Sequence, residues 1–419
     1  MNTGATSEKI QQRKLLVLTT TFPRWKLDTI PSFVYELSKR LARRFAVSIL
    51  TPNYPAAETD EIMEGMEVHR FRYFLRKYEK LAGGYGVLPT LKKNKLYYLL
   101  IPFFVVAEFF ALRNEVKRRR PDVIHAHWIP QAFIGVLIKK LYGVSLVVTA
   151  HGSDVFGMRG AFSVTLKRFT LKNADKITVV SEALRKEVLM KIDHNLQIEV
   201  IPMGVDSTQF HPNKEDPSLR EHYAIEGPFL LFVGRLSQEK GVRYLIQAMR
   251  QITQEFPKAK LLVVGKGMLE GELKQLTKEL GLQGNVVFTG AIPNYLLSAY
   301  YATADVFVAP SVIAPGGFTE GLGLTIVEAG LSGCVPVASN IGGIPDVIKD
   351  GVSGFLVEQR NPRAIFEKVV TLLKDRSLAD RMKQEGRCEI LQKFDWEIVS
   401  ARYEEVLNAS LSEDASSGR

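Results

Sequence analysis

Cysteine is scarce in this chain, because Cys334 and Cys388 are the only two among 419 residues. Two cysteines exclude a disulfide framework and a zinc site made of four thiolates, so we expect two reduced thiols in a cytoplasmic protein. The first ten residues, MNTGATSEKI, lack the basic start and the apolar core of a secretory signal peptide. We therefore expect no signal peptide.

Several motifs with well-known chemistry are also missing. The sequence has no Walker loop, no G-x-S-x-G elbow and no G-x-G-x-x-G after its first expected strand. It also lacks zinc-finger spacing, an RNP-like stretch and a basic helix with heptads, and this disfavours nucleic acid as a partner.

Acidic residues are few in the first half of the chain. Residues 1–200 hold 32 Lys and Arg against 18 Asp and Glu, a net charge of +14, whereas residues 201–419 have a net charge of −4. This asymmetry indicates that the first half meets an anionic partner, either a membrane surface or an acidic substrate.

Short apolar runs alternate with helical patterns, and the alternation occurs twice. The first half predicts strands at 14–20, 46–52, 122–128, 145–151 and 176–181, and helices at 31–44 and 131–143, the second ending at Gly143. The second half predicts strands at 228–236, 259–267, 285–290, 304–311 and 335–340, a helix at 240–252 and final helices within 363–409. The fold class is therefore α/β, with two doubly wound domains.

The proline- and polar-rich stretch 198–217 indicates a linker between these domains. We predict an N-terminal domain over 1–205, a second domain over 206–390, and a C-terminal helix within 391–419. This helix is expected to pack back on the N-terminal domain before a disordered tail.

Residues 96–112, LYYLLIPFFVVAEFFAL, are almost entirely apolar and are flanked by basic residues. A membrane span needs about 20 such residues, and this run is interrupted by Pro102 and Glu108. We expect a buried helix that packs on the first sheet, in preference to an element on a membrane surface.

Polar residues follow the expected strands at the sheet edge where doubly wound domains bind ligands. In GRLSQEKGV (234–242), Gly234 permits close backbone approach, and Arg235 and Lys240 supply two cations. Cations beside free backbone N–H groups are typical of a diphosphate site. The alternative is a solvated turn with ordinary surface cations.

In FTEGLGLTIVEAG (318–330), two glutamates lie eight positions apart. A helix is expected to start near Gly323, so its first N–H groups would form a cradle for phosphate or sugar oxygen beside Glu320 and Gly321. Glu328 would lie more than one turn into this helix and could accept hydrogen bonds from a vicinal diol such as ribose. Alternatively, Glu328 is a solvent-facing acid on the helix, and Glu320 is an acid that the helix dipole stabilises. The two glutamates could also be the carboxylate pair of a glycoside hydrolase, but the nearby cations disfavour that interpretation.

Three histidines follow or lie in expected strands. His151 ends the strand at 145–151 and is either a ligand contact or a structural histidine. His125 and His127 share one face of a strand, but no carboxylate lies near them in sequence, so we expect a structural or acceptor-side role and no metal site.

Taken together, these stretches resemble the retaining GT-B glycosyltransferases, the group related to sucrose- and mannose-transferring enzymes. The matching stretches run in order through most of the chain: HAHW (125–128), HGSDV (151–155), VVSE (179–182), IPMGVD (201–206), GRLSQEKG (234–241), VGKG (264–267), TEGLGLTIVEA (319–329), GCVPVASNIGGIPDVI (333–348) and DGVSGFLV (350–357). Glu320 and Glu328 have the spacing of that family's E-x7-E motif. The resemblance implies two Rossmann-like domains that face each other across a cleft.

The resemblance also implies roles for particular residues. The catalytic set would be Glu320 near the reacting sugar carbon, His151 on the transferred sugar, and Arg235 with Lys240 on the diphosphate. The donor-binding set would be Gly234, Arg235, Lys240, Gly265, Ile292, Gly321, Gly323, Leu324 and Glu328. The family usually works without a catalytic metal, so we expect no cofactor and a nucleotide-sugar donor.

One segment departs from the family pattern. Many members have a glycine-rich loop after the first strand, whereas this chain reads TTFPRWKLDTIPSF (20–33). The acceptor-side residues expected there are Phe22 and Pro23, with His127 nearby.

We therefore predict a cytoplasmic retaining glycosyltransferase that acts in cell-surface polysaccharide or glycoconjugate synthesis, with peripheral contact to the inner face of an anionic membrane. The first domain would bind a glycan, lipid-linked or small-molecule acceptor, and the second would bind the donor. The alternatives are a sugar phosphorylase or nucleotide-sugar epimerase of the same fold, and a non-catalytic nucleotide- or sugar-binding protein.

Overall fold

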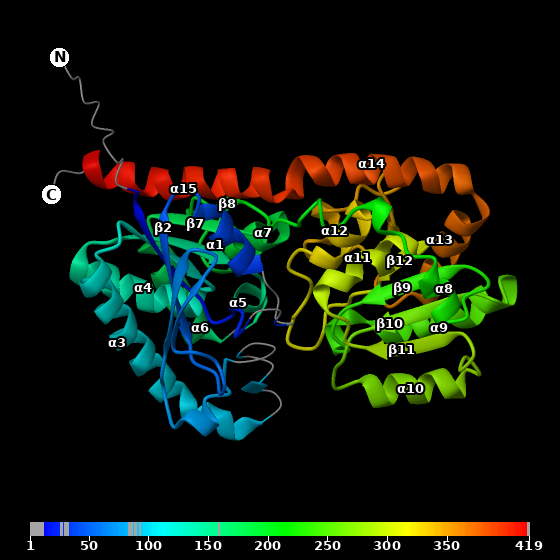
Figure 1. Cartoon of the computed structure of the whole chain (residues 1–419), viewed down its shortest axis with the longest axis horizontal. Coiled ribbons are helices and arrows are strands. Elements are labelled where there is room, and N and C mark those ends of the chain that lie inside the picture. The colour runs from blue at the N-terminus through cyan, green and yellow to red at the C-terminus, as the bar shows by residue number, and fades with distance from the viewer. Residues whose placement is uncertain are drawn as a thin grey trace, which may run out of the picture. The chain divides into compact units, whose positions relative to one another are not determined.

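The computed structural model describes residues 12–25, 28, 33–82, 87, 90–91, 94–157 and 160–416 (Figure 1). Two compact units make up the chain. The first contains residues 1–149, 169–177 and 403–419, and the second contains residues 150–168 and 178–402. The units interleave in sequence, and the domain limits expected from the sequence stay a prediction.

The first sheet has eight strands in the order β3-β4-β2-β1-β5-β6-β7-β8. All described pairings are parallel except that of β3 with β4, which is antiparallel. The strands are β1 (Lys14–Leu18), β2 (Ala46–Pro52), β3 (Asp60–Met63), β4 (Met66–Phe71), β5 (Val123–His127), β6 (Ser145–Ala150), β7 (Lys176–Val179) and β8 (Glu199–Val200). The core strands match the sequence prediction closely, because their apolar runs are buried on both faces.

Helices connect these strands and cover the sheet (Figure 1). They are α1 (Phe33–Leu41), α3 (Ile101–Arg119), α4 (Ile129–Tyr142), α5 (Ser153–Phe156), α6 (Ala161–Lys172) and α7 (Glu182–Lys191), with 3₁₀ turns η1 (Arg76–Tyr78) and η2 (Lys95–Leu100). Gly143 ends α4 in the left-handed conformation, as predicted. The start of the helix predicted at 31–44 lies outside the described residues.

The second sheet has six strands in the order β11-β10-β9-β12-β13-β14, and all its described pairings are parallel. The strands are β9 (Phe229–Val233), β10 (Lys260–Val264), β11 (Val286–Gly290), β12 (Val306–Ala309), β13 (Val335–Ser339) and β14 (Phe355–Val357). Read along the chain, this order is 3-2-1-4-5-6, the order of Rossmann folds. The prediction of two doubly wound α/β domains is confirmed.

The remaining elements surround the second sheet or follow it. They are α8 (Ser218–His222), α9 (Val242–Glu255), α10 (Glu270–Glu279), α11 (Asn294–Thr303), α12 (Leu324–Leu331), α13 (Pro362–Lys374), α14 (Arg376–Phe394) and α15 (Trp396–Ser416), with 3₁₀ turns η3 (Pro212–Lys214), η4 (Gln238–Lys240) and η5 (Ile344–Asp346). Helices α9 and α13 pack together over a core that includes Leu230, Leu245 and Val369.

One element was not predicted and one prediction needs correction. The stretch 60–71, for which no element was predicted, forms the β3–β4 hairpin, whose turn places Glu64 and Gly65 at positive φ. The apolar run 96–112 was expected to be buried. By length and composition Lys95–Arg119 is apolar enough to cross a membrane, but only 22% of its most apolar window is buried.

The buried side of α3 holds an acid, Glu108, that is 1% exposed. Burial raises the pKa of Glu108 to about 8, against a smaller opposing effect of a hydrogen bond with Gln131. The other carboxyl oxygen, Oε1, has no hydrogen-bond partner in the part of the chain that the structure describes. The carboxyl is therefore neutral at neutral pH, as its surroundings require.

We expect Glu108→Gln to raise the free energy of unfolding at alkaline pH by more than about 1 kcal/mol and to change it little at acidic pH. The native carboxyl holds a proton that the unfolded chain has released above its ordinary pKa of 4.5, so the parent loses stability as pH rises from there through about 8. The glutamine does not titrate. Urea unfolding across this pH range measures the effect, with exposed Glu367→Gln as the control. Parallel pH curves for parent and Glu108→Gln would contradict the assignment.

Candidate functional site

The second sheet changes direction between β9 and β12, its two central strands. Ligands of such sheets bind beyond the carboxyl ends of the strands at this point. Gly234 and Arg235 follow β9, and Pro310 and Ser311 follow β12, so the loops predicted to carry the site start at the expected edge.

Backbone segments approach one another closely at this edge. Gly241 has a φ of +63°, and a Cβ atom there would lie 1.9 Å from the carbonyl oxygen of Pro310. At Gly265, which follows β10, a Cβ would lie 1.9 Å from the carbonyl oxygen of Gly234. Glycine is needed at both positions because any side chain would force these loops apart.

The Lys240 ammonium and the Glu320 carboxylate form an ion pair, with 2.5 Å between Nζ and Oε2. Both side chains are mostly buried, with 16% and 19% of their surfaces exposed. Lys240 ends the 3₁₀ turn η4, which corrects the prediction that it opens a helix; α9 begins at Val242. Two residues that are 80 positions apart in sequence, both predicted to act on the donor, are thus brought into contact.

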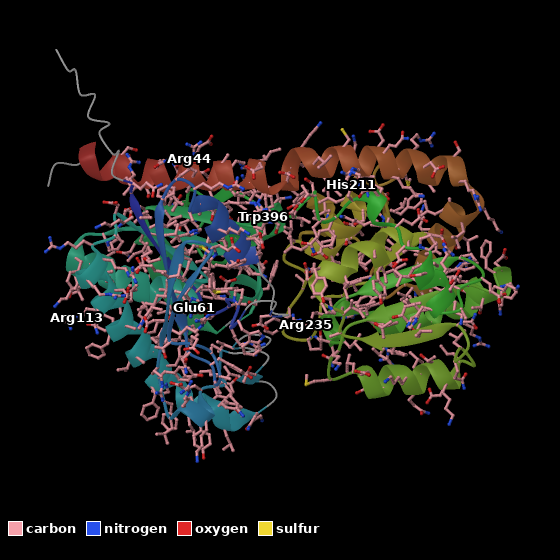
Figure 2. All side chains as sticks on the ribbon, viewed as in Figure 1. Arg44, Glu61, Arg113, His211, Arg235 and Trp396 are labelled. Carbon is pink, nitrogen blue, oxygen red and sulfur yellow. The ribbon has the colours of Figure 1, made fainter. Side chains whose placement is uncertain are left out.

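Arg235 projects from the loop after β9 and leaves 45% of its side chain exposed (Figure 2). Its guanidinium lies 3.4 Å from Glu239, a residue that the sequence reasoning did not consider. Burial acts to raise the pKa of Glu239, but the Ser237 hydroxyl, the residue's own N–H group and the two cations outweigh it, so the pKa is lowered. The carbonyl of Glu239 also accepts a hydrogen bond from Val312, which joins this loop to the one after β12.

The predicted helix start at Gly323 is confirmed, because α12 begins at Leu324 with Gly323 as its left-handed N-cap. Glu320 stays in the preceding loop, where its carbonyl accepts a hydrogen bond from Gly343 at 3.1 Å. The N–H groups in the first turn of α12 cannot form the regular helical hydrogen bond, because no carbonyl of the helix lies four residues before them. They form a partly positive end beside the carboxylate of Glu320.

Glu328 lies one turn into α12 and accepts a hydrogen bond from the hydroxyl of Tyr301 at 2.8 Å. Burial raises the pKa of this glutamate to about 7, although the bond from Tyr301 acts to lower it. Tyr301 is fully buried, and its ring contacts those of Phe210 and Phe307. The sequence reasoning missed Tyr301, because nothing in YY (300–301) distinguishes a core tyrosine from one that holds a carboxyl group.

His151 follows β6 and belongs to the second compact unit. The carboxylate of Asp154 accepts hydrogen bonds from the N–H groups of His151 and Gly152, at 3.1 and 2.9 Å. A Cβ on Gly321 would lie 2.5 Å from the carbonyl oxygen of His151. The structure therefore places the His151 backbone directly against the loop that carries Glu320.

The three predicted acceptor-side residues lie in the interior of the first unit. Phe22 is 4% exposed and packs edge-on against Tyr35. The Pro23 carbonyl accepts a hydrogen bond from buried Arg70, and His127 is fully buried. Their acceptor role stays a prediction, and their side chains offer an acceptor little surface.

Trp128 is a feature that the sequence reasoning did not single out. It follows β5, next to β1, where the first sheet changes direction. Its φ of 70° with a ψ of 144° is uncommon for a residue with a side chain, and such strain concentrates at functional positions. The sequence HAHW (125–128) gives no indication that Trp128 would adopt a positive φ.

The remaining predicted positions concern donor binding and metal. Ile292 is half-buried in the loop between β11 and α11. The rings of His125 and His127 lie 4.2 Å apart, which confirms that they share a face of β5, and burial lowers the pKa of His125 to about 3. No group of three or more His, Cys, Asp or Glu side chains among the described residues could hold a metal ion.

Family comparisons match both halves of the chain. Residues 216–388 match the family described as "Glycosyl transferases group 1", and residues 30–209 match "Glycosyltransferase Family 4". A GDP-mannose-dependent α-(1-6)-phosphatidylinositol monomannoside mannosyltransferase of Mycolicibacterium smegmatis is 32% identical over 283 residues, which are 67% of this chain and 74% of that protein.

Solved structures share the fold at lower identity. A sucrose-phosphate synthase from Thermosynechococcus elongatus has a TM-score of 0.80 at 20% identity, over 96% of this chain and 100% of that one. Anabaena Alr3699/HepE, in complex with UDP and glucose, has a TM-score of 0.71 at 20% identity, over 95% of this chain and 100% of that one. These likenesses confirm the predicted GT-B class, with two Rossmann-like domains.

Proposed function

Because this chain belongs to the group 1 glycosyltransferases, we propose that it moves a hexosyl or related sugar from a nucleotide-diphosphate sugar to an acceptor, with retention of anomeric configuration. The acceptor is a glycan, a lipid-linked sugar or a small molecule. The observation that carries the proposal is the contact between Lys240 and Glu320 beside the start of α12. It places a cation and an anion beside the N-terminal end of α12, at the edge of the sheet where a donor would bind.

The donor diphosphate is assigned to Arg235, Lys240 and the first turn of α12. A guanidinium can bind two phosphate oxygens at once, an ammonium adds a compact charge, and a helix N-terminus adds oriented N–H groups. Gly234 and Gly265 have no side chains and so allow close approach of the diphosphate. Support comes from the names of the relatives, one of which is GDP-mannose-dependent and another of which was solved with UDP.

Lys240 has a second task in this proposal. Its ammonium is now neutralised by Glu320, and a diphosphate would compete with the carboxylate for it. When the bond between sugar and diphosphate breaks, negative charge grows on the leaving phosphate, and Arg235 and Lys240 stabilise that charge. We assign this work to the two cations and propose no metal cofactor.

Glu320 and His151 are assigned to the transferred sugar. The loop at Glu320–Gly321 and the backbone of His151 are in contact, so both residues can reach the same small ligand. The carboxylate beside the reacting carbon would stabilise positive charge that develops on the sugar ring. The leaving diphosphate would help to deprotonate the acceptor, which attacks from the same face and so preserves the configuration.

Glu328 is assigned to the ribose. Its carboxyl has a hydrogen bond from Tyr301 on one oxygen, Oε2, and the other oxygen can accept from a hydroxyl of the nucleotide. Ile292, in the loop after β11, would contact the donor from the same edge of the sheet.

The reaction is tested first by donor binding and then by product analysis. A thermal-shift screen of UDP-, GDP- and ADP-sugars should identify a stabilising donor, since a ligand at 100 times its Kd adds about 2.7 kcal/mol. NMR of the product formed from that donor should show the donor's anomeric configuration. An inverted product would contradict retention, and turnover that needs inorganic phosphate and no nucleotide would indicate a phosphorylase instead.

We expect Lys240→Ala and Glu320→Gln to separate binding from chemistry. Lys240→Ala removes a phosphate contact and leaves Glu320 facing the diphosphate, so nucleotide affinity should fall by about tenfold or more. Glu320→Gln removes the competing charge, so nucleotide affinity should stay equal or rise while turnover falls by about a hundredfold. Calorimetry with the nucleoside diphosphate and steady-state kinetics measure the two effects.

A matched control for both variants is Lys258→Ala. Lys258 pairs with Glu226 on the surface, and each side chain is 71% exposed. This variant should bind and turn over donor as the parent does. If Glu320→Gln and Lys240→Ala also turned over donor at the parent's rate, the catalytic assignment would be wrong.

We expect Glu328→Gln to weaken the nucleotide by about tenfold at alkaline pH and to remove a pH dependence of binding. Because burial raises the pKa of Glu328 to about 7, the parent carboxyl gains a proton as pH falls through that value and becomes a poorer acceptor for ribose. The glutamine oxygen still accepts from Tyr301, so the fold should persist. Titrations with ribose and 2′-deoxyribose nucleotides check the role: equal losses for both in the variant would argue against a ribose contact.

A further inference from the structure

The outward side of η2 and α3 is a row of exposed apolar side chains. Leu99 is 70% exposed, and Phe103, Val106 and Phe110 are 54%, 55% and 51% exposed. Their spacing of four, three and four residues places them on one face of a helix. Leu96, one 3₁₀ turn earlier, is 71% exposed and extends the row. We call these five residues the outer row.

The opposite side of the same helix is already packed. Phe104, Leu112 and Val116 are nearly fully buried, and the ring of Phe104 contacts those of Phe71 and Tyr73. The core of the first unit thus uses one face of α3, and the outer row takes no part in it. An apolar face of this kind on a surface helix is typical of a site that meets an apolar partner.

The corner after β4 extends the outer row onto a second element. Phe74, Leu75 and Tyr78 are 37%, 61% and 47% exposed. The ring of Phe74 lies 5.3 Å from that of Phe103 and 6.3 Å from that of Tyr78. The apolar surface therefore spans two segments that are distant in sequence.

Charge around this surface has one sign. The described segments 72–82 and 94–120 contain ten Lys and Arg and three acids. The acids, Glu79, Glu108 and Glu115, are 0%, 1% and 5% exposed. The exposed basic residues are Arg72, Arg76, Lys77, Lys80, Lys95, Lys117, Arg118 and Arg120. Every strongly exposed charge on these segments is positive.

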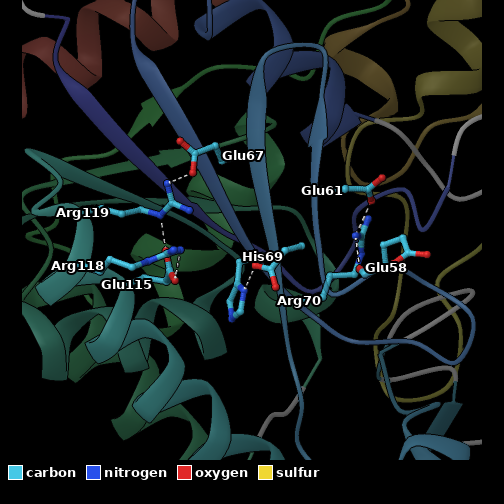
Figure 3. Close-up of polar contacts among 9 residues, drawn as sticks. Glu58, Glu61, Glu67, His69, Arg70, Glu115, Arg118 and Arg119 are labelled. Atoms are coloured by element: carbon cyan, nitrogen blue, oxygen red, sulfur yellow. Dashed lines mark hydrogen bonds and ion pairs between the residues drawn. The ribbon is translucent and has the colours of Figure 1, made fainter.

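Helix α3 is held in the first unit at its C-terminal end. Arg119 bonds to Glu115 on its own helix and, at 2.5 Å, to Glu67 on β4 (Figure 3). Arg118 adds a second bond to Glu115 at 2.8 Å. A helix that left this position to cross a bilayer would carry Glu108 and Glu115 into lipid, which is costly.

We propose that the outer row and the Phe74–Tyr78 corner dock this protein on the surface of an anionic lipid bilayer. The apolar side chains enter the boundary between headgroups and acyl chains, and the surrounding cations meet lipid phosphates. The helix stays folded on its sheet and lies in the plane of the surface. The inference concerns the first unit alone and is independent of the donor chemistry proposed for the second.

Charge also favours a bilayer over a second copy of this chain. Two copies that met symmetrically through this face would bring their basic residues together without exposed acids to offset them. An anionic surface offers the opposite charge and an apolar layer within about 10 Å of it.

The test is flotation of the full chain with vesicles of phosphatidylcholine alone and of phosphatidylcholine mixed with phosphatidylglycerol. The parent should bind the mixed vesicles at least about tenfold better, and added salt should weaken binding because it screens the headgroup charge. Leu99→Ser/Phe103→Ser should reduce binding to the mixed vesicles by about tenfold or more. Met190→Ser is the control, because Met190 is an apolar side chain that is 73% exposed on α7, in the second compact unit.

Four outcomes would overturn the proposal. They are no flotation with either vesicle at low salt, equal flotation with both, equal binding by parent and double variant, and a parent dimer that the double variant makes monomeric without change in vesicle binding. Nucleotide affinity of the double variant should equal that of the parent. This measurement separates failure of the docking surface from failure of the donor site, and an unchanged urea unfolding curve confirms that the first unit of the variant is folded.

Discussion

The contact between Lys240 and Glu320 is the constraint around which the second unit's site is arranged. It joins the loop after β9 to the loop before α12, and each loop is held in place by its neighbours through backbone contacts at Gly241 and Gly343. Because both side chains are mostly buried, removing either leaves a charge that the remaining structure cannot solvate well. The ammonium of Lys240 therefore stays paired with the carboxylate of Glu320 until another anion, such as the proposed donor diphosphate, binds to the ammonium.

Glu328 and Tyr301 are a second pair of buried groups, in which the cost of burying a carboxyl group is offset in a different way. Among the residues that the structure describes, no cation pairs with Glu328, which receives instead a hydrogen bond from Tyr301. The pKa of about 7 that burial imposes lies close to the pH at which most enzymes work, so a small change in its surroundings would decide whether it is charged. Glu320, which has Lys240, and Glu328, which has a phenol, are thus chemically distinct although the sequence presents them as a matched pair.

The strands and several helix ends could be predicted from the sequence alone, whereas the side-chain contacts of the site could not. Apolar runs such as KLLVL and FLLFV predicted the strands because buried parallel strands need little else, and Gly143 and Gly323 predicted helix ends because few other residues fit there. The contact of Lys240 with Glu320 and the bond from Tyr301 were not predicted, since each depends on side chains that meet only after the sheet has formed. The exposed side of α3 was missed for a related reason, because hydropathy cannot tell which of two apolar faces the core will use.

The C-terminal segment of α15 has a consequence for how the protein is made. Tyr403 is fully buried in the first unit, where its ring lies 5.6 Å from that of His125, and the carbonyl of Ser410 accepts a hydrogen bond from Ser145. The first unit thus contains residues that leave the ribosome after the whole second unit has been made. Its opening strands therefore stay incompletely covered until residues 403–410 have been made, and this unit completes its fold only after the second unit is available.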